Sequence, residues 1–431
     1  MTQASGHIDF SLEPSTDSSK GGWKLVKMGD LLRIKHGFAF KSEYFGDSGD
    51  YIVMTPGHFH EEGGFRKREK VEKYYTSDEF PEEYILREGD LVLAMTEQAA
   101  GLLGSTVRIP ESKKFLHNQR LGLVQDIATD RILKEYVYLA FKNLVARRQI
   151  DVTAAGTKVK HTSPNKLYEV EFLLPPLPEQ KAIAAVLSKW DEGIAKLTEL
   201  IELKAQKQKG LMQQLLTGKK RFAGFEKEKG FKETKIGMVP KDWEVIKAKD
   251  IFKSISIKNN QGEELLAVTQ DRGAIPRSML EGRVMSPAGS TMGYKLVVPG
   301  NFIISLRSFQ GGLEFSEYRG LVSPAYTILE EKIPLDKTFF RYFFKSPEFI
   351  SRLAVAVIGI RDGKQVSFED FGFLSFRFPP LAEQQKIASV LNAAEQELKV
   401  LRKKLESMKA QKKGLMQQLL TGKVRVKTGK L

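Results

Sequence analysis

A ten-residue stretch occurs twice in this chain without a single change. GLMQQLLTGK runs from Gly210 to Lys219 and again from Gly414 to Lys423. A proline-containing signature precedes each copy, PPLPEQ at 175–180 and PPLAEQ at 379–384, and both pairs are 204 positions apart. That period is too long for a solenoid, whose repeats run to about 20–50 residues. The sequence therefore predicts two large, similar halves that end in the same element.

The repeated element is predicted to be a helix of about 40 residues, roughly 60 Å long at 1.5 Å per residue. Pro178 suits the first helical turn, and Gly218 and Gly422 suit the left-handed position just past a helix end. Apolar residues recur at alternating steps of four and three, the pattern of a coiled-coil seam. In the first copy they are Ile183, Leu187, Trp190, Ile194, Leu197, Ile201, Leu211 and Leu215, and in the second Ile387, Leu391, Ala394, Leu398, Leu401, Leu405, Met408, Leu415 and Leu419.

Polar residues interrupt both seams, namely Lys204, Gln208 and Lys412. A polar seam position usually lowers stability and fixes the register of the pair. Because one chain carries both seams, we expect the helices to pair within the chain rather than between chains.

Composition narrows the class of protein. The chain has 431 residues, with 68 Lys and Arg against 53 Asp and Glu, so its net charge is +15. An excess of this size is common in proteins that bind nucleic acid. The absence of cysteine excludes disulfides and Cys-ligated metal sites. No run of 18 apolar residues predicts a membrane span, and the polar N-terminus lacks the apolar core of a signal peptide. We expect a cytoplasmic protein without membrane association.

The halves also begin alike. WKLVKMGDLL, from Trp23, corresponds to WEVIKAKDIF, from Trp243. Short apolar runs separated by turn residues follow in each half and predict short strands. A helical stretch comes next, from Lys134 in one half and Lys337 in the other, and then a turn-rich segment and a last strand before the proline signature. The order is globular domain, long helix, globular domain, long helix.

At this point the chain resembles the specificity subunits of Type I restriction–modification enzymes. The resemblance rests on PPLPEQKAIAAVL, PPLAEQQKIASVL, both LLTGK helix ends, IGMVPKDWEV at 236–245 and GLVSPAY at 320–326. It implies an α+β fold, with two similar globular target recognition domains separated by two long helices that pair as an antiparallel coiled coil. The expected boundaries are a flexible tail at 1–22, recognition domains at 23–174 and 236–378, conserved helical regions at 175–218 and 379–431, and a charged linker at 219–235.

The resemblance also implies partners. Each domain would recognise one half of a split site in double-stranded DNA. Two modification subunits, which methylate adenine, and restriction subunits would assemble on the helices. No cofactor is expected in this chain; S-adenosylmethionine, ATP and Mg are expected on the partner subunits.

A search for catalytic motifs gives none that the sequence supports. The chain lacks an Asn/Asp-Pro-Pro-Tyr/Phe motif and a phosphate-binding G-x-x-x-x-G-K-[ST] loop. His58 and His60 are close in sequence, but a turn or surface role is favoured over metal binding, which needs more ligands. Glu179, near the start of the first long helix, is interpreted as a residue that interacts with the positive helix end.

Base recognition needs forked donors and acceptors such as Arg, Asn, Gln and Lys on accessible loops. For any one of these side chains, phosphate contact or plain solvation is the alternative. The candidates of the first domain are Gln98, Asn118, Gln119, Arg120, Thr157, Lys158, Lys160 and His161. Those of the second are Arg307, Ser308, Gln310, Arg319, Arg361, Lys364 and Gln365.

Both long helices repeat a glutamine pair outside the seam. Gln213 and Gln214 in the first copy, and Gln417 and Gln418 in the second, are predicted to bind the modification subunits; the alternative is retention for packing after duplication. The favoured function is a non-catalytic DNA-specificity and scaffolding subunit. A structural coiled-coil adaptor without sequence-specific DNA binding is the alternative, and a self-contained methyltransferase-nuclease is a weaker third.

Overall fold

The computed structural model describes residues 22–61, 63–68, 72–77, 79–97, 99–156, 159–280, 291–357 and 366–426. The chain divides into two compact units, which we call unit 1 and unit 2. Unit 1 comprises Met1–Lys196 and Leu405–Leu431, and unit 2 comprises Leu197–Lys404. The expected tail at 1–22 lies outside the described residues except for Gly22.

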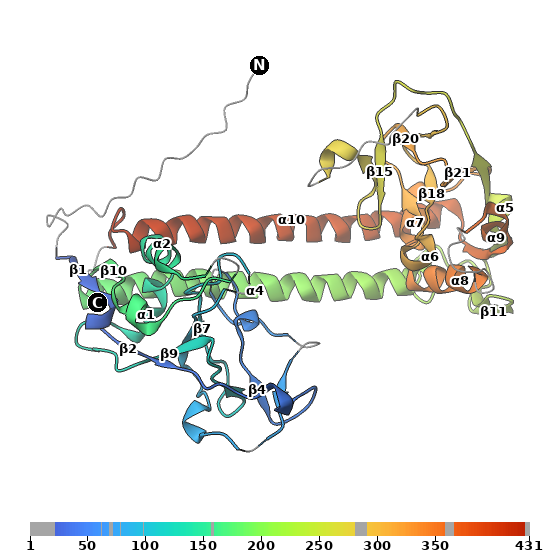
Figure 1. Ribbon diagram of the computed structural model, residues 1–431. Helices are drawn as coiled ribbons and strands as arrows, with labels where there is room; N and C mark the ends of the chain where they lie inside the picture. Colours follow the sequence, from blue (N-terminus) through green and yellow to red (C-terminus); the bar gives the residue numbers. More distant parts are fainter. Residues whose placement is uncertain are drawn as a thin grey trace. The chain divides into compact units, whose positions relative to one another are not determined.

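Two long helices contribute to both units (Figure 1). Helix α4 spans Leu177–Leu216 and α10 spans Leu381–Leu420, with 40 residues each. Beyond their ends, Gly218 and Gly422 adopt positive φ angles of 71° and 69°, the left-handed conformation predicted for both. The predicted long helices and the α+β fold class are confirmed.

The two helices pair in antiparallel orientation. In unit 1 Lys412 forms an ion pair with Asp191, and in unit 2 the Lys204 ammonium lies 2.6 Å from the Glu397 carboxylate. The position on α10 falls as the position on α4 rises, which defines the antiparallel direction. All predicted seam residues are buried or half-buried. The two seam lysines therefore each meet an acid on the facing helix, which satisfies a polar position within an apolar seam.

Unit 1 contains two four-stranded sheets, in the orders β2-β9-β6-β7 and β3-β5-β4-β8. The first comprises β2 (Arg33–His36), β9 (Leu121–Gln125), β6 (Leu91–Ala94) and β7 (Thr106–Arg108). The second comprises β3 (Phe45–Gly46), β5 (Tyr74–Tyr75), β4 (Tyr51–Val53) and β8 (Phe115–Leu116). Strands β1 (Lys24–Lys27) and β10 (Glu171–Leu174) pair with each other, and the shorter helices are α1 (Lys134–Ala140), α2 (Leu144–Thr153) and α3 (Pro164–Tyr168).

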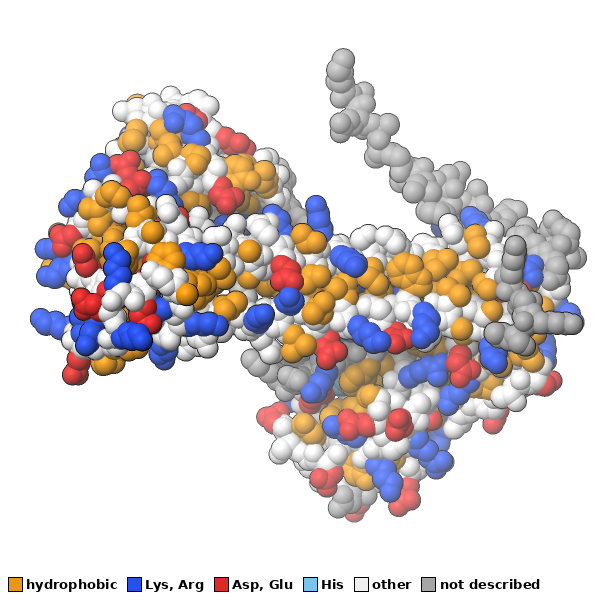
Figure 2. Space-filling model, turned by 180° about the vertical axis from the view of Figure 1, so that it is seen from behind, with side chains coloured by type: hydrophobic (Ala, Val, Ile, Leu, Met, Phe, Trp, Pro, Cys, Tyr) orange, Lys and Arg blue, Asp and Glu red, His pale blue; other side chains and the backbone are white. Residues whose placement is uncertain are grey.

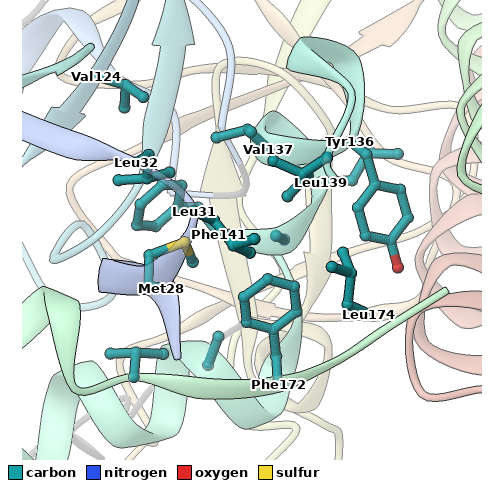
Figure 3. Close-up of a cluster of buried hydrophobic side chains, with 14 of the residues drawn as sticks. Met28, Leu31, Leu32, Val124, Tyr136, Val137, Leu139, Phe141, Phe172 and Leu174 are labelled. Atoms are coloured by element: carbon teal, nitrogen blue, oxygen red, sulfur yellow. The ribbon is translucent and has the colours of Figure 1, made fainter. Parts of the chain in front are cut away.

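The core of unit 1 lies between these helices, the β1–β10 pair and the long-helix ends. Figure 3 shows Met28, Leu31 and Leu32 facing side chains of α1 and β10. Ile183 of α4 and Leu419 of α10 belong to the same buried cluster. The start of one long helix and the end of the other are therefore part of the core of unit 1, where burial of each large apolar side chain contributes about 1.5–3 kcal/mol.

Unit 2 repeats this plan with a four-stranded sheet in the order β14-β21-β18-β19. Its strands are β14 (Phe252–Ile255), β21 (Thr327–Glu331), β18 (Phe302–Ile304) and β19 (Glu314–Phe315). Two-stranded pairs are β13 (Glu244–Lys247) with β22 (Ser375–Phe378), β15 (Leu266–Thr269) with β16 (Gly273–Pro276), β17 (Lys295–Val297) with β20 (Gly320–Val322), and β11 (Phe231–Thr234) with β12 (Gly237–Pro240). The shorter helices are α5 (Ala248–Ile251), α6 (Ser308–Gly311), α7 (Lys337–Phe343), α8 (Pro347–Val357) and α9 (Phe368–Phe373).

The core of unit 2 is rich in phenylalanine. Phe252, Phe302 and Phe344 contact one another with ring centroids 5.0–5.8 Å apart, a spacing at which tilted and edge-to-face aromatic pairs are favourable. Leu215 of α4 and Ile387 of α10 belong to this cluster. In unit 2, therefore, the end of α4 and the start of α10 pack on the globular part.

The charged stretch at 219–235 is not loop throughout. Its last residues form β11, which pairs with β12 through a turn in which Thr234 Oγ1 donates to the Gly237 carbonyl at 2.7 Å. Among the described residues, no helix is both long and apolar enough to cross a bilayer.

Candidate nucleic-acid interface and helix clasps

Three segments of unit 1 meet at the edge of its first sheet, where β6 ends and β9 begins. The Met95 N–H donates to the Arg120 carbonyl at 2.9 Å, and the Thr162 N–H donates to the Met95 carbonyl at 2.9 Å. The Glu97 N–H donates to the Lys160 carbonyl at 2.8 Å. These bonds bring together segments 95–97, 117–120 and 159–162, which contain the described DNA-contact candidates of the first domain: Asn118, Gln119, Arg120, Lys160 and His161.

The turn before β9 is tightly fixed. Asn118 Oδ1 accepts a hydrogen bond from the Arg120 N–H at 3.0 Å, and the Gln119 N–H donates to the Phe38 carbonyl at 2.9 Å. A Cβ at Gly37 would lie 2.0 Å from the Asn118 carbonyl oxygen, so a larger residue there must displace the turn. Asn118 is buried, whereas Gln119 and Arg120 are exposed. We therefore assign Asn118 a positioning role and keep Gln119 and Arg120 as candidates for DNA contact.

His117, which the sequence analysis did not select, packs beneath the surface of this turn and helps to hold it. Its side chain is fully buried, and its Nε2 lies 3.0 Å from the Leu121 carbonyl. Burial lowers the pKa of His117 to about 4, so the ring is neutral at physiological pH. A neutral Nε2–H can donate to that carbonyl, which ties the start of the turn to β9. Its place directly before the candidates Asn118, Gln119 and Arg120 was the available signal in the sequence.

The remaining candidates of the first domain differ in their surroundings. Lys160 is paired with Asp151 at 2.6 Å, and this hydrogen bond raises the pKa of its ammonium group. His161 is exposed, while its backbone pairs with Ala155 in both directions. The other candidates of this domain lie outside the described residues: Gln98, Thr157 and Lys158.

Unit 2 has a turn of the same kind at the corresponding place, before β21. Ser323 Oγ accepts from the Ala325 N–H at 3.3 Å, and the Tyr326 N–H donates to the Ser323 carbonyl at 3.1 Å. In unit 1 Asn118 makes the equivalent pair of bonds to Arg120 and Leu121. The turn geometry is thus repeated, but unit 2 has no arginine or glutamine on it.

Two exposed candidates of unit 2 lie instead at α6, which follows β18. Arg307 and Gln310 are exposed. Ser308 is fully buried, and its Oγ accepts from the Ser305 N–H at 2.8 Å, so it holds the start of α6 rather than facing a ligand. Arg319 lies at the opposite end of β20 from the turn and pairs with Glu263 at 2.8 Å. Three further candidates lie outside the described residues: Arg361, Lys364 and Gln365.

A buried carboxylate clasp joins the two long helices in unit 2. Glu383, in the first turn of α10, accepts from Trp243 Nε1 at 2.8 Å and from Arg221 Nη2 at 2.8 Å. Arg221 follows the end of α4 and also pairs with Asp242 at 2.9 Å. The side chains of Arg221 and Glu383 are 8% and 0% exposed. We call this the unit 2 clasp.

Unit 1 contains the same arrangement, which we call the unit 1 clasp. Glu179, in the first turn of α4, accepts from Trp23 Nε1 at 2.8 Å and from both Nε and Nη2 of Arg425 at 2.6 Å. Arg425 follows the end of α10, just as Arg221 follows that of α4. Glu179 was interpreted as a partner of the positive helix end; its position in the first turn agrees, but its hydrogen bonds go to a tryptophan and an arginine.

The pKa values of one carboxyl group in each clasp, Glu179 and Asp242, are lowered, which favours their ionised forms. Burial alone would raise the pKa of Glu179, but hydrogen bonds from Arg425 and Trp23 outweigh it and lower the pKa overall. The hydrogen bond from Arg221 lowers the pKa of Asp242. Each arginine also lies over the indole ring of its clasp, with the guanidinium carbon 5.3 Å from the ring centroid in both units, which adds a cation–π contact.

The glutamine of the PPLxEQ signature has its own structural role. Gln180 Oε1 accepts from the Leu133 N–H just before α1, at 2.9 Å, and Gln384 Oε1 accepts from the Asp336 N–H just before α7, at 2.9 Å. Their Nε2 groups donate to the carbonyls of Pro175 and Pro379 at 2.8 Å. The signature therefore joins each long helix to the globular part that precedes it.

The glutamine pairs predicted to bind partners lie close to the helix ends. Gln213, Gln214 and Gln418 are exposed, and Gln417 is half-buried. Gln213 lines a cavity of about 950 Å³ in unit 2, whose apolar walls include Met212, Leu216, Phe231 and Met238. The structure thus places Gln213 on the wall of this cavity, and partner binding by both glutamine pairs stays a prediction.

The two members of the His58–His60 pair differ, because His58 has a structural role and His60 is exposed. His58 is buried, its Nε2 lies 2.7 Å from Glu72, and its Nδ1 accepts from the Thr55 N–H at 3.0 Å. Within the part of the chain that the structure describes, no three His, Asp or Glu side chains are grouped so as to hold a metal ion.

Comparison with known proteins identifies similar chains. Residues 20–205 match the family model described as Type I restriction modification DNA specificity domain. The chain is 26% identical over 427 residues to the Type I restriction enzyme MjaVIII specificity subunit of Methanocaldococcus jannaschii, covering 94% of this chain and 93% of the relative. It is 28% identical over 292 residues to the putative type I restriction enzyme MjaX specificity subunit of the same organism, covering 66% and 64%.

The fold has a solved counterpart. The crystal structure of the Type-I restriction-modification system S subunit from M. genitalium superimposes with a TM-score of 0.53 at 18% identity, covering 93% of this chain and 96% of the other. The likeness extends over both units.

Proposed function

Because the chain belongs to the specificity subunits of type I restriction–modification enzymes, we propose that each unit recognises one half of a two-part DNA target. One observation supports this most directly: the same sheet edge occurs in both units, with exposed Gln119 and Arg120 in one and Arg307 and Gln310 in the other. Forked amide and guanidinium groups match the edges of adenine and guanine. Different side chains on a repeated framework suit two different half-sites.

Half-site recognition can be tested by selecting bound duplexes from a random library with the assembled complex. Replacing Gln119 and Arg120 with Ala should relax base choice in one half-site only, and replacing Arg307 and Gln310 should relax it only in the other. Removal of each bidentate interaction should reduce discrimination by roughly 1–3 kcal/mol. Lys423→Ala, at an exposed residue past α10, is the control. Equal relaxation in both half-sites with either variant would contradict the assignment.

The chain acts, in this proposal, without catalysis of its own. Methylation of adenine and cleavage of DNA belong to modification and restriction subunits, which would supply S-adenosylmethionine, ATP and Mg. A purified chain incubated with duplex DNA and S-adenosylmethionine should transfer no methyl group, and methylation should appear when modification subunits are added. Methyl transfer by the isolated chain, after removal of any co-purifying methyltransferase, would refute this part.

The helices are proposed to be the docking surface for two modification subunits. In unit 2, Leu200 and Leu203 on α4 and Val400 on α10 are exposed within one helical turn of the Lys204–Glu397 pair. Figure 2 shows hydrophobic side chains exposed along the paired helices. An exposed apolar face on a two-helix pair favours the addition of further helices from a partner. The predicted glutamines lie toward the ends of the same helices.

Charge substitution tests this docking proposal. Changing Gln213 and Gln214 to Glu should weaken binding of one modification subunit, and changing Gln417 and Gln418 should weaken binding of the other, with helicity by circular dichroism unchanged. Analytical ultracentrifugation gives the stoichiometry. Lys220→Glu, at an exposed position past α4, controls for added negative charge. Assembly at full stoichiometry in a variant with all four glutamines changed to Glu would overturn the role of these glutamines.

A further inference from the structure

The β15–β16 hairpin of unit 2 presents a fixed, polar tip. Thr269 pairs with Gly273, which leaves Gln270, Asp271 and Arg272 exposed between them. Thr269 Oγ1 accepts from the Arg272 N–H and donates to the Gly273 carbonyl, both at 3.1 Å. Gly273 has a φ of +70°, and a Cβ there would lie 2.2 Å from the Phe315 carbonyl oxygen. The tip is therefore set in a defined conformation close to β19.

This tip lies directly against α6, which contains the predicted DNA-contact residue Gln310 and directly follows the predicted contact residue Arg307. A Cβ at Gly311 would be 2.9 Å from Gln270 Nε2, so the glutamine side chain is packed on the last residue of α6. The Gln310 and Gly311 N–H groups both donate to the Arg307 carbonyl, at 2.9 and 3.2 Å. Gln270 therefore contacts α6 at Gly311, which is adjacent to Gln310 and one helical turn after Arg307.

One lysine fixes the tip to α6. Lys345 Nζ donates to the Gln270 carbonyl at 3.1 Å, to the Gly311 carbonyl at 3.0 Å and to Glu314 Oε2 at 2.7 Å. An ammonium group has three donors, and here they bind three separate segments. Glu314 is 1% exposed, and burial raises its pKa while the hydrogen bond from Lys345 opposes that rise. The ion pair with Lys345 thus stabilises the buried Glu314 carboxylate, and it holds the Lys345 ammonium group in place.

We propose that the hairpin tip and α6 form one composite base-recognition surface, in which Gln270 and Arg272 contact bases alongside Arg307 and Gln310, and that Lys345 is its positioning residue. This inference rests on the proposed recognition of one half-site by unit 2. A glutamine and an arginine at the tip suit bidentate contact with adenine and guanine in the major groove. Because Lys345 binds backbone carbonyls, it fixes the separation of the two elements irrespective of their side chains.

The surface is specific to unit 2. The corresponding segment of unit 1 follows β4 and contains Pro56, Gly57 and the buried His58. None of these presents a forked donor to solvent. Unit 1 therefore relies on the turn before β9, and unit 2 on the hairpin tip and α6, for the same purpose.

Selection of bound duplexes by the complete complex tests the proposal. Gln270→Ala and Arg272→Ala should each relax base choice at one or two positions of the second half-site, with a loss of discrimination of roughly 5- to 150-fold. The first half-site should be unaffected. Lys253→Ala, which removes an exposed, ion-paired lysine of β14 in the same unit, should leave both half-sites unchanged.

The positioning role has its own readout. Lys345→Met should relax the positions read by the tip and those read by α6 together, and Lys345→Arg should restore part of the preference. The proposal is overturned if Gln270→Ala and Arg272→Ala leave every base preference intact while Arg307→Ala relaxes one. It is also overturned if they weaken binding equally for all sequences with a smaller salt dependence, since that identifies phosphate contacts. If Arg307→Ala and Gln310→Ala are silent as well, the assignment of α6 itself fails.

Discussion

Removing the arginine of the unit 2 clasp should destabilise this protein more than the matching change in unit 1. Arg221→Ala leaves the carboxylates of Glu383 and Asp242, which are 0% and 8% exposed, without their cation. Breaking a buried ion pair from one side costs about 3–5 kcal/mol, because a buried charge is left unpaired. Arg425→Ala leaves the Glu179 carboxylate without this cation, and the Arg425 side chain is 37% exposed. Solvent screening reduces the expected loss to about 1–3 kcal/mol.

Hydrogen exchange followed by mass spectrometry is the suitable assay, because it reports the opening of each helix end separately. Amides at 381–387 and 211–218 should exchange at least about a hundredfold faster in Arg221→Ala, since 1.4 kcal/mol corresponds to a factor of ten. Amides at 177–183 and 415–420 should respond to Arg425→Ala, and by less. Lys220→Ala and Lys423→Ala, exposed neighbours of the two arginines, should have no effect.

A second variant separates charge burial from the loss of packing. Combining Arg221→Ala with Glu383→Gln removes the more deeply buried of the two charges and keeps an acceptor for Trp243 Nε1, while the Asp242 carboxylate still lacks its arginine. Part of the protection against exchange should therefore return. If the double variant is as labile as Arg221→Ala, or if the two single arginine variants lose equal protection, the reasoning from buried charge is wrong.

Three further expectations concern the fixed turn, its histidine and the signature glutamine. Gly37→Ala should displace the Asn118 turn, destabilise unit 1 by about 1–3 kcal/mol in urea unfolding, and relax the first half-site alone in duplex selection. Burial lowers the pKa of His117 to about 4 in the folded chain, against 6.5 for an exposed histidine. Between these two pH values the unfolded chain binds more protons, so the free energy of unfolding should fall as the pH drops, by up to about 1.4 kcal/mol per pH unit. His117→Gln should remove this pH dependence. Gln384→Leu leaves the Asp336 N–H and the Pro379 carbonyl without their hydrogen-bond partner, which should cost about 1–3 kcal/mol per group. Hydrogen exchange around the start of α7 should therefore accelerate. An unchanged exchange rate would show that water replaces the amide.

The long helices could be predicted because their determinants are local. Each seam is a periodic pattern within about 40 residues, and Gly218 and Gly422 act through their own backbone conformation. The duplication predicted two similar globular parts, and the corresponding sheets of the two units, β2-β9-β6-β7 and β14-β21-β18-β19, confirm it. The antiparallel direction came from family resemblance; in the structure it is visible in the two interhelical ion pairs.

The candidate site was predicted less completely. Gln119, Arg120, Arg307 and Gln310 are exposed, as the prediction of accessible side chains requires. Asn118 and Ser308 instead hold a turn and the start of α6, and residue type alone does not distinguish a supporting amide or hydroxyl from an exposed one. The tip of the β15–β16 hairpin was not selected, because its proximity to α6 depends on Lys345, which follows Gln270 by 75 residues.

The clasps show which features the sequence determined and which features depended on the tertiary structure. Sequence alone determined that the helices exist, where they end and that their starts share a PPLxEQ signature. Only the tertiary structure decided what that glutamate binds: Glu179 meets Trp23 and Arg425, which are 156 and 246 residues away along the chain. A periodic pattern is set by neighbours on one helix, whereas a buried carboxylate must be neutralised by whichever cation the completed fold brings beside it.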